Sequence, residues 1–237
     1  MNKPFKFKQF SVQQDRTAMK IGTDGVLLGA WTSIANKPNS ILDIGAGTGI
    51  LSLMLAQRSI AESIEALEID EEAYEQCVEN FESSPWADRL FCYHAGLDEF
   101  IEEIEEPYDL IISNPPFYSE NVSSGDAARD RARQNQSLPF DELLDGASKL
   151  LAPEGIFSTI IPFKEESDFI ALANSFDLYL NRVLRVRGNA TSELKRSLLT
   201  FSFSKNAVQE DELTIEVERH QYTSEYQKLT KAFYLKM

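Results

Sequence analysis

The chain has 237 residues, of which 26% are charged, and a net charge of −15 at pH 7. This length, with 43% hydrophobic residues, is enough for one large domain with a substantial core. No apolar run approaches the roughly 18 residues that cross a bilayer, the lysine-rich N-terminus lacks the apolar core of a signal peptide, and two cysteines and two histidines are too few for a disulfide framework or a multi-histidine metal centre. We expect a monomeric protein of the cytoplasm that binds neither membranes nor metal ions.

Strands alternating with helices dominate the sequence from residue 41 onwards. Short apolar strands are predicted at residues 41–44, 64–69, 90–93, 109–113 and 156–161, and later strands at 178–186, 198–203 and 214–218. Helices are predicted at residues 50–55, 73–81, 140–151, 165–175 and 224–231. This order implies a parallel sheet covered by helices on both faces. Because no long linker or repeat interrupts it, we expect residues 1–237 to form a single α/β domain.

Three glycines at alternate positions follow the first predicted strand, in the run Asp43-Ile-Gly-Ala-Gly-Thr-Gly49. Glycine permits positive φ and close approach of the backbone to a ligand. The spacing is not the GxGxxG of dinucleotide-binding folds, and a phosphate-binding Gly-Lys-Ser/Thr ending is missing. A bare tight turn is the alternative, but Glu68, at the end of the next strand, can accept hydrogen bonds from both hydroxyls of a ribose. The pattern favours S-adenosylmethionine, bound by Asp43, Gly45, Gly47, Gly49 and Glu68.

The run Asn114-Pro-Pro-Phe117 follows the fourth predicted strand. An exocyclic amino nitrogen is a poor nucleophile because its lone pair is delocalised, and two acceptors placed on its N–H bonds would free that lone pair. The Asn114 side-chain oxygen and the Pro115 carbonyl can be these acceptors, Pro116 stiffens the turn, and Phe117 can stack on a base. The prolines alone could merely end a strand. Because both motifs fall at the carboxyl ends of the strands, where such sheets bind ligands, we interpret these four residues as catalytic.

With these motifs the chain resembles the class I S-adenosylmethionine-dependent methyltransferases that modify an amino nitrogen. More narrowly, it resembles the bacterial tRNA(Val) adenine-N6 methyltransferases, on the runs Lys20-Ile-Gly-Thr-Asp-Gly-Val-Leu-Leu-Gly29, Arg131-Ala-Arg133, Tyr222-Thr-Ser-Glu-Tyr226 and Phe233-Tyr-Leu235. The resemblance covers nearly the whole chain. It implies methyl transfer to N6 of the adenosine 3′ of the anticodon, and a Rossmann-like fold with a seven-stranded, mostly parallel sheet, one antiparallel edge strand and helices on both faces.

The resemblance also suggests roles outside the two motifs. It implies that residues 1–39 cover the cofactor against a core of residues 40–237, with Asp24 as candidate for a contact to the methionine amine or, alternatively, as a helix cap. Relatives often carry an acid after the third strand that meets the cofactor adenine. Here Gly96 occupies that place, and Asp98 is the candidate two positions later. We interpret His94 as a sheet residue.

The negative charge is concentrated in one part of the chain, because residues 62–109 hold 17 acidic residues and one basic residue. The remainder is close to neutral and contains basic clusters at residues 1–20, 129–133 and 182–196. Phosphate contacts need lysine and arginine, although a solvated surface is the alternative for each cluster. We expect tRNA contacts from the following residues: Arg129, Arg131, Arg133, Lys195 and Arg196.

Other amino-group methyltransferases remain as alternatives. Enzymes that methylate guanine N2 in ribosomal RNA share the motif type. The glutamine-N5 enzymes carry an extra helical N-terminal domain, for which about 40 residues leave no room, and the DNA adenine enzymes usually carry a separate target-recognition domain. A small-molecule methyltransferase would normally show an apolar lid rather than arginine clusters. The intact Asn114–Phe117 motif opposes a non-catalytic RNA-binding protein on the same fold.

Overall fold

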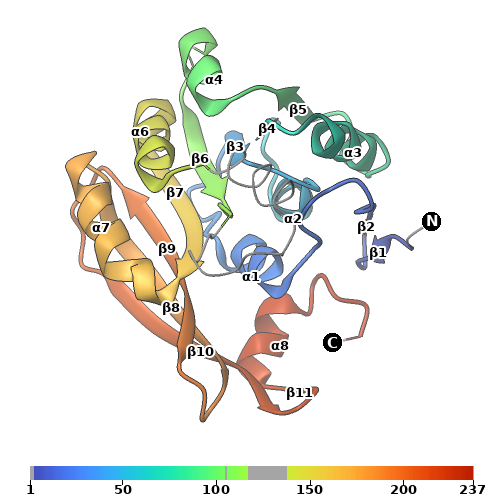
Figure 1. Cartoon of the computed structure of the whole chain (residues 1–237), viewed down its shortest axis with the longest axis vertical. Coiled ribbons are helices and arrows are strands. Elements are labelled where there is room, and N and C mark those ends of the chain that lie inside the picture. The colour runs from blue at the N-terminus through green and yellow to red at the C-terminus, as the bar shows by residue number, and fades with distance from the viewer. Residues whose placement is uncertain (1–2, 105, 117–137, 237) are drawn as a thin grey trace, which may run out of the picture.

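A computed structural model describes residues 3–104, 106–116 and 138–236 of the chain (Figure 1). Its strands are β1 (Phe5–Lys6), β2 (Ser11–Val12), β3 (Ser40–Ile44), β4 (Ser63–Glu68), β5 (Leu90–His94), β6 (Tyr108–Ser113), β7 (Leu151–Pro162), β8 (Tyr179–Asn189), β9 (Leu194–Ser202), β10 (Gln209–Glu218) and β11 (Gln221–Tyr222). Its helices are α1 (Thr23–Trp31), α2 (Ile50–Arg58), α3 (Glu71–Glu82), α4 (Leu97–Glu103), α6 (Phe140–Leu150), the 3₁₀ turn η1 (Phe163–Glu165), α7 (Glu166–Ser175) and α8 (Ser224–Thr230).

The central sheet has the strand order β11-β10-β8-β9-β7-β6-β3-β4-β5. Strands β3 to β7 run parallel to one another, and β9 runs antiparallel to both of its neighbours, β7 and β8. Strand β10 lies parallel to β8, and the short edge strand β11 is antiparallel to β10. The predicted α/β class with a mostly parallel sheet is therefore confirmed.

The predicted number of strands is wrong. Within the described residues the sheet has nine strands rather than seven, because β10 and β11 extend it beyond β8. The antiparallel edge strand is present as β11, but a second and longer antiparallel strand, β9, lies inside the sheet and was not predicted there. The physical reason is its composition: Leu198, Leu199 and Phe201 are fully buried, so both faces of β9 need cover and both of its edges are paired.

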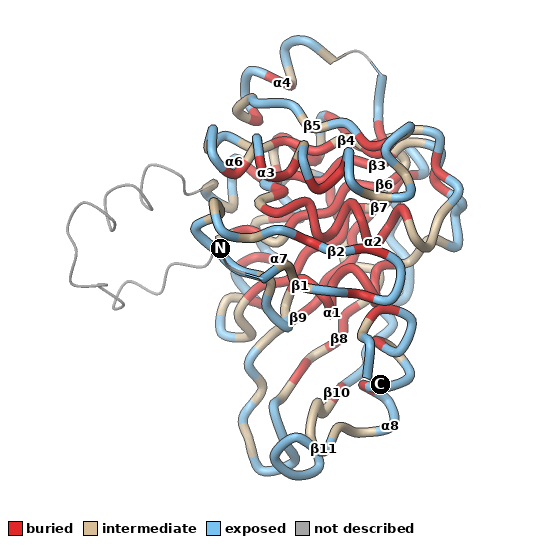
Figure 2. Tube along the Cα trace, turned by 90° about the vertical axis from the view of Figure 1, so that its right-hand side faces the viewer, coloured by how far each residue is buried: buried red, intermediate tan, exposed pale blue. Residues whose placement is uncertain are grey.

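Helices cover both faces of the sheet, as predicted. Side chains alternate along β3, so that Ile41 belongs to one apolar cluster and Leu42 and Ile44 belong to the other. The first cluster includes residues of α1, α2 and α3, and the second includes residues of α4, α6 and α7. In Figure 2 the central strands and α2 are mostly buried, and the exposed residues lie around them. Asp43, between Ile41 and Ile44, therefore faces the layer that contains α2.

The two ends of the described chain meet on the α2 side of the sheet. Phe7 forms an isolated antiparallel bridge with Tyr234, and the backbone N–H of Lys8 donates to the carbonyl of Phe233. The rings of Phe5 and Phe10 pack against Phe7. The N-terminal hairpin β1–β2, which was not predicted, is held in this way by aromatic contacts rather than by the main sheet. None of the helices in the described residues is long and apolar enough to cross a membrane.

Candidate functional site

The glycine turn joins β3 to α2 with an αL-type backbone. Gly45, Gly47 and Gly49 have φ values of 74°, 56° and 75°, which side chains with a Cβ rarely adopt. A Cβ on Gly49 would lie 2.5 Å from Phe81 Cε1 and 2.8 Å from Cys77 Sγ, so this glycine lets α3 pack closely. A Cβ on Gly45 or Gly47 would meet no atom within 4 Å. The turn is therefore closed on the α3 side and open on the side where a ligand would approach.

Glu68 lies at the rim of this turn, at the carboxyl end of β4. Its Oε2 accepts a hydrogen bond from the Gly47 N–H at 2.7 Å, and its Oε1 accepts one from the Asp70 N–H at 2.9 Å. Burial raises the pKa of Glu68, while these two hydrogen bonds favour the carboxylate. Each oxygen retains a further lone pair, so the carboxylate can still accept from the hydroxyls of a ribose.

Asp43 lies beneath the glycine turn rather than at its surface. The side chain is fully buried, and its Oδ2 accepts hydrogen bonds from the Ser52 N–H at 3.2 Å and the Ser52 hydroxyl at 2.8 Å. It thus satisfies an N–H in the first turn of α2, whose N-cap, Gly49, has no side chain to do so. Burial raises the pKa of Asp43 to about 7, against the opposing effect of the Ser52 hydrogen bonds. Asp43 thus supports the turn through Oδ2, while its Oδ1 is buried without a hydrogen-bond partner among the described residues, and the predicted ligand contact stays a prediction.

The Asn114-Pro-Pro turn begins where β6 ends. The Ser113 hydroxyl donates to the Ile44 carbonyl at 2.8 Å, which ties the end of β6 to the end of β3. Asn114 Oδ1 is buried and has no hydrogen-bond partner among the described residues. Such a group costs about 1–3 kcal/mol if it is left without a partner, so it is suited to accept a hydrogen bond from a bound substrate. Phe117 lies outside the described residues.

The segment before α1 is fastened to α3 and to the glycine turn. Asn80 Nδ2 donates to the Thr48 carbonyl at 2.9 Å and to the Gln13 carbonyl at 3.0 Å, and Asn80 Oδ1 accepts from the Gln13 N–H. The Arg16 N–H donates to Gln76 Oε1 at 3.1 Å. Sequence reasoning missed Gln76 and Asn80, although polar residues on the apolar side of a helix, next to Cys77 and Phe81, were an available signal.

Asp24 and Arg196 were predicted to bind different ligands, but they contact one another. Arg196 Nε donates to Asp24 Oδ2 at 2.7 Å. Helix α1 begins at Thr23 with Gly22 as its N-cap, so Asp24 lies inside the first turn and is not the capping residue that the alternative required. A Cβ on the next residue, Gly25, would lie 3.9 Å from Asn114 Nδ2. The ion pair therefore adjoins the Asn114 turn.

Asp98 is exposed in the first turn of α4 and turns back over Gly96. A Cβ on Gly96 would lie 2.6 Å from Asp98 Oδ1 and 3.9 Å from Ile69 Cδ1. Ile69, directly after Glu68, is 55% exposed, and its carbonyl lies 3.0 Å from His94 Nε2. His94 ends β5, which confirms its interpretation as a sheet residue. Ile69 is a further candidate for a ligand contact at this edge, and the sequence analysis did not select it. An exposed isoleucine directly after a strand was the available signal.

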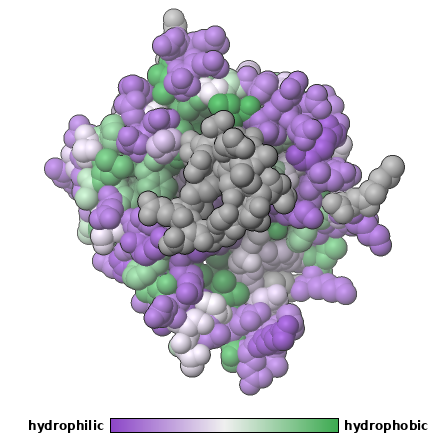
Figure 3. Space-filling model, viewed as in Figure 1, coloured by the Kyte–Doolittle hydropathy of each residue, from purple (hydrophilic) through white to green (hydrophobic). Residues whose placement is uncertain are grey.

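The basic clusters differ in what they contact. Arg129, Arg131 and Arg133 lie outside the described residues. Arg16 pairs with Glu75 and Glu79 of α3, a helix whose surface is strongly hydrophilic in Figure 3. Within the last cluster, Arg182 lies over the Trp31 ring and Arg185 pairs with the buried Glu166. Lys195 and Arg196, by contrast, lie at the start of β9.

The described residues contain no group of three or more histidine, cysteine or acidic side chains arranged to hold a metal ion. What they do bring together is a glycine turn with an open face, a carboxylate at its rim and a buried amide oxygen without a partner. All three lie at the carboxyl ends of the adjacent parallel strands β4, β3 and β6. This edge is where such sheets bind ligands.

Comparisons with known proteins agree with this arrangement. Residues 22–177 match the family model of the methyltransferase small domain. The chain is 64% identical to the tRNA1(Val) (adenine(37)-N6)-methyltransferase of Flavobacterium psychrophilum, covering 98% of this chain and 100% of that protein. It is 45% identical to the protein of the same name from Bacteroides fragilis, with complete coverage of both.

Solved structures show the same fold at low sequence identity. A predicted O-methyltransferase from Agrobacterium tumefaciens superposes with a TM-score of 0.69 at 20% identity, covering 89% of this chain and 96% of that one. The ribosomal protein L11 methylase of Lactobacillus delbrueckii superposes with a TM-score of 0.53 at 16% identity, covering 75% and 76%. These similarities establish the fold alone.

Proposed function

The chain belongs to the family of tRNA1(Val) (adenine(37)-N6)-methyltransferases, and on that premise we propose that it transfers a methyl group from S-adenosylmethionine to N6 of adenosine 37 in tRNA1(Val). The observation that carries the proposal is the buried Oδ1 of Asn114 beside the glycine turn, which has no hydrogen-bond partner in the part of the chain that the structure describes. An amide oxygen in that place is suited to accept a hydrogen bond from an amino group.

The residues of the glycine turn fit S-adenosylmethionine. The open faces of Gly45 and Gly47 leave room for a ligand against the backbone, and the Glu68 carboxylate at the rim suits a ribose. Asp43 supports the turn from below through Ser52. When bound, this cofactor supplies an electrophilic methyl group on its sulfonium. We propose Asp98 and the exposed Ile69 as the contacts to its adenine and Asp24 as the contact to its amine.

The chain's own contribution to the chemistry is to hold the target amino group. Asn114 Oδ1 and the Pro115 carbonyl accept hydrogen bonds from its two N–H groups, which frees the nitrogen lone pair for attack. The prolines have no N–H donors and restrict φ, so these acceptors keep their positions. Most of the acceleration comes from this alignment, and the released proton passes to Asn114 or to water. The adenine must leave its stack to reach the site, and Phe117 stacks on it there.

Substrate contacts outside this pocket come from basic residues. We propose that Lys195 and Arg196, at the same end of the sheet, contact tRNA phosphates. The same role is proposed for Arg129, Arg131 and Arg133, which lie 12 to 16 residues after Phe117 in the sequence.

The proposed function is tested with labelled S-adenosylmethionine and an unmodified tRNA1(Val) transcript, digested to nucleosides after incubation. We expect the label in N6-methyladenosine as identified by mass spectrometry, and its loss from a transcript with guanosine at position 37. Label in N2-methylguanosine would retain the chemistry and overturn the substrate. Absence of label at saturating cofactor would overturn the function.

A further inference from the structure

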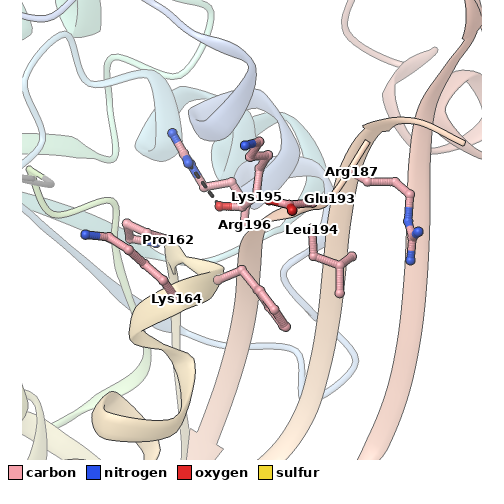
Figure 4. A pocket seen from close by; sticks show the side chains of 8 residues that line it. Pro162, Lys164, Arg187, Glu193, Leu194, Lys195 and Arg196 are labelled. Carbon is pink, nitrogen blue, oxygen red and sulfur yellow. Dashed lines mark hydrogen bonds between the residues drawn. The ribbon is translucent and has the colours of Figure 1, made fainter. Parts of the chain in front are cut away.

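A basic groove lies at the end of the sheet where β7 leads into η1 and β8 turns back into β9. Its volume is about 640 Å³. The basic groove is lined by Pro162, Phe163, Lys164, Arg187, Glu193, Leu194, Lys195 and Arg196. Figure 4 shows Lys164 at one end of the row of cations and Arg187 at the other, with Lys195 and Arg196 between them.

The topology connects this groove to the Asn114 turn. Because β9 is antiparallel to β7, its first residues lie beside the carboxyl end of β7, with Arg196 opposite Pro162. Arg196 pairs with Asp24, and the neighbouring Gly25 approaches Asn114. A chain bound in the groove therefore continues directly toward the predicted catalytic turn.

Two of the groove cations, Lys164 and Lys195, are available to a new partner, whereas Arg187 pairs with Glu212 and Arg196 with Asp24. Lys195 has no ion pair among the described residues, and Lys164 pairs only with Glu165, where the two side chains are 65% and 37% exposed. Such exposed pairs contribute little, so a phosphate can replace the carboxylate. Glu193 is the one acid in the lining. Arg185 shows the contrast, because it makes a bidentate contact to the buried Glu166 and cannot turn outward without depriving that carboxylate of its ion-pair partner.

We propose that the basic groove binds the phosphate backbone of the tRNA stem beside the target nucleotide. The inference rests on the proposed function and extends it from the reacting base to the surrounding RNA. Strands β7 and β8 lie two strand spacings apart, about 10 Å, so the row spans more than one phosphate position. Stem RNA is recognised through its backbone rather than its base edges.

The distribution of charge along the sheet points to the same side. The block at 62–109 holds 17 acidic residues, and the described ones lie directly before β4 or on and between β4, α3, β5, α4 and β6. Strand β5 is the sheet edge farthest from β8, β10 and β11. The β5 edge therefore repels RNA more strongly than the groove, whose lining holds four cations and one acid, although β10 beside β8 is also acidic. An acidic peptide has the same sign of charge as RNA, and the experiment below distinguishes the two.

The test compares two double variants with the same change in charge. Lys164→Glu with Lys195→Glu alters the groove. Lys37→Glu with Lys149→Glu alters two exposed lysines that precede β3 and β7, at the amino ends of these strands and away from the groove. Binding of an unmodified tRNA1(Val) transcript is followed by fluorescence anisotropy between about 50 and 200 mM KCl. Binding of S-adenosylmethionine is followed by calorimetry.

We expect the groove variant to raise the tRNA Kd about tenfold or more. Its log affinity should also fall less steeply with log salt, with a slope smaller in magnitude by about 1.4 to 1.8, which is the contribution of two phosphate contacts. Its KM for tRNA should rise, while kcat at saturating tRNA and the cofactor Kd stay near those of the wild type. The control variant should keep the wild-type slope. Equal losses in both double variants, or none in either, would overturn the groove.

Two further outcomes separate the groove from the proposed function. If the wild type binds but does not methylate this tRNA, and only the groove variant loses binding, the groove stands and the function fails. If tRNA binding is normal in the groove variant but binding of poly-glutamate is lost, the surface belongs to an acidic protein partner and the groove proposal fails.

Discussion

Asp24 and Arg196 are 172 positions apart in the chain and form an ion pair in which Arg196 Nε lies 2.7 Å from Asp24 Oδ2. The pair joins α1, next to the Asn114 turn, to β9, which lines the basic groove. It therefore links the part of the molecule that we assign to the cofactor with the part that we assign to RNA.

Separate substitutions at this pair should have separate effects. We expect Asp24→Asn to raise the Kd for S-adenosylmethionine about tenfold or more, the value of one charge-assisted hydrogen bond. Arg196→Ala should instead raise the KM for tRNA and leave cofactor binding nearly unchanged. Calorimetry and steady-state kinetics measure both. If the two variants lose cofactor affinity to the same extent, the ion pair itself shapes the cofactor site and the separate roles are wrong.

Substitution of Asn114 tests the catalytic assignment. Asn114→Ala removes the buried acceptor, and we expect kcat to fall about 100-fold or more, as for loss of one positioned hydrogen-bonding group. The Kd for S-adenosylmethionine should stay close to the wild-type value, because Glu68 and the glycine turn are untouched. Single-turnover methylation and calorimetry give the two numbers, and parallel loss of both would contradict the assigned role.

The glycine turn allows a matched comparison of two alanine substitutions. Gly45→Ala and Gly49→Ala both force a Cβ into positive φ, at about 1–2 kcal/mol each. Only Gly49→Ala also collides with Cys77 and Phe81, so its free energy of unfolding should be lower by a further 1–3 kcal/mol or so. Urea unfolding measures the difference. Equal stability of the two variants would show that α3 moves away freely.

The buried Asp43 should make stability depend on pH. Its folded pKa of about 7 lies above its ordinary value of 3.8, so between these two values the folded state binds more protons than the unfolded state. The Asp43 contribution is therefore present below about pH 4 and is lost as the pH rises to 7, on the order of 4 kcal/mol in total.

Asp43→Asn resembles the protonated acid and keeps an oxygen for Ser52. We expect its free energy of unfolding to equal that of the wild type near pH 4 and to exceed it above pH 7, in denaturant titrations without cofactor. A constant difference at all pH values would mean that Asp43 is charged in the folded protein throughout this range.

Asn80 should hold the N-terminal segment in place. Asn80→Ala removes its bonds to Gln13 and Thr48, and we expect proteolytic cleavage before α1 to accelerate and the cofactor Kd to rise. Asn174→Ala, at an exposed position of α7, is the matched control and should change neither. Unchanged cleavage in Asn80→Ala would mean that other contacts suffice to hold the segment.

Much of the fold and of the cofactor edge could be predicted from local patterns. The short apolar runs that end at Ile44 and Ser113 predicted parallel strands, and the glycines and prolines that follow predicted turns at one edge of the sheet. Strand β10 was recognised only from residue 214 onwards, because its first half is Gln-Glu-Asp-Glu and shows no alternation of apolar side chains. It is a strand because it pairs with β8 rather than because it buries side chains.

The sequence by itself determined which chemistry the protein carries, because the backbone conformation of the glycine turn and the acceptors of the Asn114 turn depend on adjacent residues. Only the tertiary structure decided which charged groups remain available. The locked Arg185 and the Asp24–Arg196 pair join residues far apart in the chain, and such pairings follow from strand order and direction. Strand β9 lies between β7 and β8 because both of its faces are buried. This placement brings Lys195 to the side of the sheet that carries the Asn114 turn.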